Sequence, residues 1–148
     1  MLTRRILILL AAGGSLIMLA GAFGFQALGY PPCAMCLWQR WPHAAAIGVG
    51  AIALALPGRL LPLAGAAAAA ATAGIGVYHT GVERDWWQGP TACTGGALGG
   101  GDLLSLDGPP LVLCDVVAWQ FLTLSMASWN ALGSLALVAL WVMAARKS

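Results

Sequence analysis

The chain has 148 residues, of which 60% are hydrophobic and only 8% are charged, and its mean hydropathy is +0.84. This composition excludes an ordinary soluble domain and predicts an all-α protein embedded in a lipid bilayer. The formal net charge of +2 is small and no basic stripe is present in the sequence, so nucleic-acid binding is not expected. Four spans of about 20 residues would use more than half of the chain, so we expect one integral membrane domain over residues 1–148.

The first apolar run covers residues 6–28 and follows Arg4 and Arg5. Basic residues also precede the apolar part of a signal peptide, but that part is only about 7 to 15 residues long. Because this run is longer, we interpret it as a retained membrane span.

The second apolar run covers residues 37–56 and contains Pro42 near its start. A helix that began at Pro42 would be too short to cross a bilayer, which needs about 20 residues. We therefore expect the helix to begin before the proline, with a kinked or loosened first turn because Pro42 removes a backbone hydrogen bond.

A C-x-x-C motif, formed by Cys33 and Cys36, stands between these two runs. In a first helical turn the two cysteines share a face, where they can form a disulfide and where unpaired amides favour a thiolate. Arg40 lies one turn past Cys36 and can stabilise an anion, either the Cys36 thiolate or oxygen charge on an electron acceptor. An arginine at the bilayer edge can instead simply extend to the interface, and the register with Cys36 favours the first interpretation.

The third run covers residues 60–78 and is dominated by alanine, with no polar face before Tyr78 and His79. Small residues let helices approach closely in lipid, so this run is predicted to be the interior packing helix. His79 can donate a proton near neutral pH or hydrogen-bond across helices. The fourth run covers residues 129–145, so the chain is predicted to form a bundle of four transmembrane helices.

A long loop, residues 79–128, separates the third and fourth runs and carries Cys93, Cys114 and all five acidic residues. The glycines between residues 95 and 101 predict a hinge. The spacing of Cys93 and Cys114 allows a disulfide without requiring one, and a structural cross-link is the alternative to a redox role. No metal is expected, because this pair lacks the close spacing of structural zinc ligands.

The basic residues predict an orientation, because lysine and arginine accumulate on the cytoplasmic side of membrane proteins. In a four-span arrangement, one side of the membrane receives Arg4, Arg5, Arg59, Arg146 and Lys147, and the other receives Arg40 and Arg84. Both termini are therefore expected in the cytoplasm. All four cysteines are expected on the outer face, in an oxidising compartment where disulfides persist.

Three stretches carry a resemblance to a known family: residues 30–40 (YPPCAMCLWQR), residues 89–93 (GPTAC), and Cys114-Asp115 followed by residues 124–130 (LSMASWN). With this order of features, the sequence resembles the disulfide bond formation protein B (DsbB) family of bacterial inner-membrane quinone reductases. The resemblance runs over nearly the whole chain. The loop between Cys93 and Cys114 is glycine-rich and shorter than in the best-known members.

The resemblance implies a thiol:quinone oxidoreductase with two redox-active disulfides, Cys33–Cys36 facing the quinone and Cys93–Cys114 facing a partner. That partner would be a periplasmic DsbA-like thioredoxin-fold protein, and the electron acceptor would be ubiquinone or menaquinone. The family arginine near the quinone ring corresponds to Arg40, and a family histidine at the end of the third span corresponds to His79. The site residues are thus Cys33, Cys36, Cys93 and Cys114 for catalysis, and Arg40, His79 and Cys36 for quinone binding.

Two other interpretations remain at this point. An enzyme of the vitamin K epoxide reductase type also combines four helices, four cysteines and a quinone-like ligand, but there the C-x-x-C motif follows the loop pair. A membrane scaffold with structural or metal-binding cysteines is the alternative outside enzymes. Quinone-dependent oxidation of a reduced thioredoxin-like protein separates that alternative from the redox interpretation.

Overall fold

The computed structural model describes residues 2–91, 93 and 113–147, and these residues are mostly helical. They form four helices and one short antiparallel hairpin: α1 (Arg4–Ala27), α2 (Ala34–Ala55), α3 (Leu60–Glu83), β1 (Gln120–Phe121), β2 (Leu124–Ser125) and α4 (Met126–Arg146). The predicted glycine hinge at residues 95–101 lies outside the described residues.

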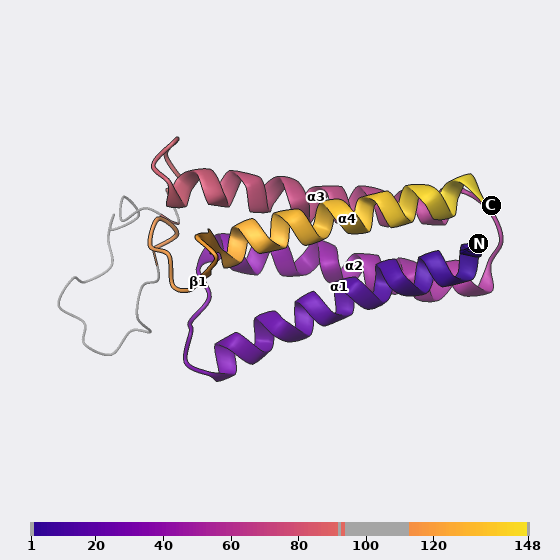
Figure 1. Ribbon diagram of the computed structural model, residues 1–148, viewed down its shortest axis with the longest axis horizontal. Helices are drawn as coiled ribbons and strands as arrows, with labels where there is room; N and C mark the ends of the chain where they lie inside the picture. The colour runs from indigo at the N-terminus through magenta and orange to yellow at the C-terminus, as the bar shows by residue number, and fades with distance from the viewer. Residues whose placement is uncertain (1, 92, 94–112, 148) are drawn as a thin grey trace.

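The helices pack as a bundle in which α1 and α3 each lie between α2 and α4 (Figure 1). Both chain ends lie at one end of the bundle, together with the turn between α2 and α3. The start of α2, the end of α3 and the start of α4 meet at the opposite end, beside the hairpin. This topology therefore brings the C-x-x-C motif and the segment around Cys114 to the same end.

Three of these helices, α1, α3 and α4, are long and apolar enough to cross a membrane. Helix α2 is 22 residues long but is not among them. The reason lies in its first half, where Gln39, Arg40 and His43 interrupt the apolar sequence. Length and composition thus support three spans in the described part of the chain.

The helix boundaries differ from the sequence-based prediction mainly at the cysteine end. Helix α2 begins at Ala34, because the Cys33 side chain caps it by accepting a hydrogen bond from the Cys36 amide. Helix α3 continues to Glu83 instead of ending at residue 78, because the side chains of His79 and Val82 are buried in the site and in the small cluster around it. His79 and Glu83 are consequently helical residues and not part of the loop.

Helix α2 is continuous through Pro42, about two turns from its start, so the proline does not fall in the first turn. A proline has no N–H, so the carbonyl four residues back, here that of Trp38, loses its usual amide partner. The Thr72 hydroxyl of α3 donates a hydrogen bond to the carbonyl of the next residue, Gln39, at 3.2 Å. Helix α3 thereby contacts the backbone of the turn that precedes the proline.

Candidate active site

An apolar cavity of about 610 Å³ opens at the cysteine end of the bundle. Its wall combines side chains from all four helices with residues of the segment between Leu113 and Phe121. The polar or ionisable side chains in this mostly apolar wall include Tyr30, Cys33, Cys36, Gln39, Arg40, His43, His79, Glu83 and Asn130. Such a cavity suits a largely apolar ligand that carries a few polar atoms.

Cys33 and Cys36 lie at the start of α2 with their sulfur atoms 2.9 Å apart. Both are free thiols, and Cys33 is buried whereas Cys36 is partly exposed. The hydrogen bond to Cys36 and the burial of its own side chain raise the pKa of the Cys33 thiol above its ordinary value. Cys33 therefore loses its proton less readily than an ordinary thiol.

Cys93 and Cys114 form a disulfide, with their Cα atoms 5.0 Å apart. Both side chains are at most 1% exposed, and the Cys114 amide donates a hydrogen bond to the Cys93 carbonyl at 3.0 Å. They pack in one buried cluster with Cys33, Met35 and Val82. The loop pair thus lies directly against the C-x-x-C pair.

The sulfur of Cys114, the sulfur of Cys33 and an imidazole nitrogen of His79 all lie within 4.8 Å of one another. The sequence spacing gave no reason to expect this grouping, because the three residues come from three different segments. The Cys114 sulfur is already bonded to Cys93 here, so it offers no thiolate for a metal ion. The grouping instead provides the proximity that thiol–disulfide exchange requires.

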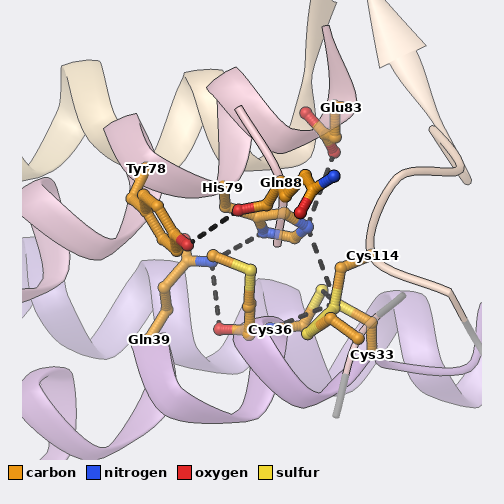
Figure 2. Close-up of a disulfide and its surroundings, with 10 residues drawn as sticks. Cys33, Cys36, Gln39, Tyr78, His79, Glu83, Gln88 and Cys114 are labelled. Atoms are coloured by element: carbon orange, nitrogen blue, oxygen red, sulfur yellow. Dashed lines mark hydrogen bonds and ion pairs between the residues drawn. A yellow bond between two sulfur atoms is a disulfide. The ribbon is translucent and has the colours of Figure 1, made fainter. Parts of the chain in front are cut away.

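His79 is almost fully buried, at 3% exposure, and lies at the centre of the site (Figure 2). Its Nε2 is 3.6 Å from the Cys33 sulfur and 3.8 Å from Oε1 of Glu83. Glu83 also accepts a hydrogen bond from Ser125, the residue that caps α4. The end of α3 is in this way tied both to the reactive cysteine and to the start of α4.

The sequence analysis did not identify the polar side chains that contact His79 on its Nδ1 side, opposite Cys33. The side-chain nitrogen of Gln39 lies 3.0 Å from Nδ1 of His79, and the side-chain amide of Asn130, on α4, donates to Oε1 of Gln39 at 2.7 Å. His43 completes the chain with a contact of 2.8 Å to Asn130. The available signal was the occurrence of these polar residues inside apolar runs, where a polar side chain is costly unless it has partners and a role.

Arg40 faces the cavity and is held by the end of α1. Its guanidinium donates to the Gln26 side chain at 2.7 Å and to the Ala22 carbonyl at 3.3 Å, and it lies 4.6 Å above the centre of the Phe23 ring. Its buried Nε has no hydrogen-bond acceptor within the described part of the chain. Arg40 lines the cavity, so its guanidinium places positive charge and N–H donors in the wall that a ligand would contact.

Comparison with known proteins assigns the chain at the level of the family. The model of the family described as "Disulfide bond formation protein DsbB" matches residues 4–144, nearly the whole chain. No match was found among curated proteins or among solved structures.

Proposed function

Because the chain belongs to the DsbB family, we propose that it is a membrane thiol:quinone oxidoreductase that reoxidises a DsbA-like protein. The family and the membrane-competent helices already identify a membrane protein of disulfide bond formation. They also favour this family over the vitamin K epoxide reductase type. The quinone, the soluble partner and the roles of individual residues are the parts that we propose.

One observation carries the proposal: the cysteines form a continuous path from the loop to the apolar cavity. The Cys93–Cys114 disulfide lies against Cys33, the Cys33 sulfur is 2.9 Å from that of Cys36, and Cys36 lines the cavity. Two electrons that enter at the loop can therefore leave at the cavity wall. Structural cross-links would not require the two pairs to be neighbours.

The proposed relay begins at the loop pair. A thiolate of the partner attacks Cys93, by analogy with the family, and the partner's second thiol resolves the mixed disulfide, which leaves Cys93 and Cys114 reduced. Cys114 then attacks the Cys33 sulfur of the Cys33–Cys36 disulfide, and Cys36 departs as a thiolate. Attack of Cys93 on Cys114 re-forms the loop disulfide and releases Cys33 with the electron pair.

The second half of the relay takes place at the cavity. Cys36 attacks the quinone, and Cys33 then attacks Cys36, so that the Cys33–Cys36 disulfide re-forms and the quinol leaves with two electrons and two protons. The cavity fits this substrate, because its wall is mostly apolar and includes the Arg40 guanidinium, whose N–H groups can donate to a quinone carbonyl oxygen. Ubiquinone and menaquinone are both suitable substrates for such a cavity.

The purified protein is expected to oxidise a reduced thioredoxin-fold dithiol protein catalytically when a quinone is supplied. Without quinone, oxidation should stop once the protein's own disulfides are consumed. The measurement is the ratio of oxidised partner to enzyme, followed together with quinone absorbance, with ubiquinone and menaquinone tested in parallel. Failure to reduce either quinone, with a folded protein and a reduced partner, would contradict the proposed function.

We further propose that α2 is the fourth span, that both termini are cytoplasmic and that the cysteines face the periplasm of a bacterial inner membrane. The polar first half of α2 is compatible with lipid because Gln39 and His43 are buried in the bundle, at 6% and 3% exposure. Arg4 donates to the carbonyls of Ala53 and Leu56, where α2 ends at the same end of the bundle as the two chain termini. The excess of basic residues at that end supports its cytoplasmic location.

This orientation predicts which surface positions react from outside the cell. In a background with serine at the four native cysteines, Trp86→Cys should be labelled in spheroplasts by a membrane-impermeant thiol reagent. The matched variant Arg59→Cys, at the opposite end of the bundle, should be labelled only after the membrane is broken. Trp86 and Arg59 are both exposed, so accessibility within the protein does not limit either reaction. The reverse pattern would invert the orientation.

A further inference from the structure

A buried chain of hydrogen bonds connects the reactive Cys33 to His43, deep in the bundle. It runs from Cys33 to Nε2 of His79 at 3.6 Å, and from Nδ1 of His79 to Gln39 at 3.0 Å. It continues to Asn130 at 2.7 Å and from there to His43 at 2.8 Å. The two amides in its middle determine the direction of every hydrogen bond in the chain.

The orientation of the Gln39 amide is set by the backbone. Its nitrogen lies 3.1 Å from the Met35 carbonyl, which can only accept a hydrogen bond. The reverse orientation would bring two oxygen atoms together at that distance. Gln39 therefore presents its NH₂ group to His79, and its oxygen to Asn130.

Asn130 reinforces this orientation from α4. Its nitrogen is 3.0 Å from the Thr72 hydroxyl and 3.4 Å from the Thr72 carbonyl, and it donates to the Gln39 oxygen at 2.7 Å. Its oxygen is consequently the atom that faces His43, and it accepts a hydrogen bond from Nε2 of that residue at 2.8 Å. An acceptor-only carbonyl fixes each amide, so neither can reverse without a cost.

The groups on both sides of His79 agree on the position of its proton. Nδ1 faces the NH₂ group of Gln39, which can only donate, so Nδ1 must be the acceptor. Nε2 faces the Cys33 sulfur and the Glu83 carboxylate, both of which can accept. In the neutral imidazole the proton is therefore on Nε2.

We infer that Gln39 and Asn130 fix the proton of neutral His79 on Nε2, so that His79 serves Cys33 as a hydrogen-bond donor and not as a base. Gln39 and Asn130 are then positioning residues, while His79 touches the reacting sulfur itself. The inference rests on the proposed relay for its chemical consequence, although the tautomer can be tested separately.

The donor role has a defined place in the relay. When Cys93 attacks Cys114, the bond between Cys114 and Cys33 breaks and the electron pair remains on the Cys33 sulfur. The Nε2–H of His79 donates to that sulfur as it becomes charged, which stabilises the leaving group without any proton transfer. Because Nε2 already carries a proton, neutral His79 cannot accept a proton from Cys33 through that nitrogen.

The tautomer is measurable in the full-length protein by NMR of ¹⁵N-histidine, because protonated and unprotonated ring nitrogens have well-separated shifts. His79→Gln identifies the signals of His79 by their loss. We expect Nε2 of His79 to be protonated and Nδ1 to be unprotonated. A proton on Nδ1, alone or together with one on Nε2, would overturn the inference.

The role of Gln39 is tested by Gln39→Met, which keeps a similar length but removes the donor. The ¹⁵N shifts of His79 should then move towards a mixture of tautomers, whereas Gln120→Met, on the exposed strand β1, should leave them unchanged. A spectrum of Gln39→Met that matches wild type would mean that Gln39 does not set the proton.

The turnover rate of variants at position 79 distinguishes a hydrogen-bond donor from a general base. A glutamine at position 79 places an amide N–H near the position of Nε2 but cannot accept a proton from a thiol, so His79→Gln should lose less of the rate than His79→Leu. His79→Leu should lose roughly tenfold to a hundredfold, the value of a hydrogen bond to a charged atom. Equal losses in both variants would make His79 a base and refute the inference. Absence of quinone-dependent oxidation in wild type would instead refute the proposed function, while the NMR result would stand.

Discussion

Cys36→Ser is expected to abolish quinone reduction while leaving one round of partner oxidation intact. The reason is that the two pairs have different roles. The Cys93–Cys114 disulfide can oxidise one reduced partner, but without Cys36 the pair at the cavity can neither form its disulfide nor attack the quinone from position 36. The measurement is single-turnover oxidation of reduced partner by pre-oxidised protein without quinone, followed by the same assay with quinone. Wild type should continue to turn over, whereas the variant should stop after one equivalent.

Cys114→Ser is the matched variant on the loop side and should fail differently. Cys93 is then an unpaired thiol that can hold an oxidised partner as a mixed disulfide, by attack on the partner's disulfide, but cannot drive turnover. If the cysteines were only structural cross-links, neither phenotype would appear, and the loss would be limited to stability, typically about 2 to 4 kcal/mol for each cross-link. Full multiple turnover of both variants in the presence of quinone would contradict the relay.

Arg40→Ala should raise the apparent KM for quinone by roughly tenfold to a hundredfold, the cost of losing one charge-assisted hydrogen bond. The guanidinium lies in the cavity wall with a buried Nε that has no acceptor among the described residues. The reaction between the loop disulfide and the soluble partner does not involve this wall, so its rate should change little. Steady-state kinetics with the quinone and the partner varied separately measure both effects.

Arg84→Ala provides the control for Arg40→Ala, because it removes the same charge from the same end of the bundle. Arg84 donates to the Thr123 carbonyl and lies over the Trp86 ring, and it does not line the cavity. Its removal should leave the KM for quinone unchanged. Equal effects of the two substitutions would indicate a general loss of positive charge, and an unchanged KM in Arg40→Ala would assign that arginine to the membrane interface.

The sequence pattern predicted correctly those features that depend mainly on residues close together in the chain. The long apolar runs predicted the helices, because burying apolar side chains in a bilayer needs no knowledge of the neighbours. The small residues of the third run predicted close packing, and the structure places the Trp141 ring against Gly65, where a Cβ would lie only 2.6 Å from ring atoms. The prediction was wrong at the end of α3, because its last turn is stabilised by tertiary burial and not by its own composition.

The sequence by itself determined the class of protein, the four helical segments, the four cysteines and the family, because hydropathy and motif spacing are properties of a linear chain. Only the tertiary structure decided that the Cys33 sulfur lies within 4.8 Å of the Cys114 sulfur, that α3 carries His79 into the site, and that Gln39 and Asn130 hold it. The residues of this site come from separate helices and the loop segment, up to 91 positions apart for Gln39 and Asn130. These polar groups are buried inside the bundle, where a polar group needs a hydrogen-bond partner. Their partners lie on other helices, so the sequence alone does not reveal them.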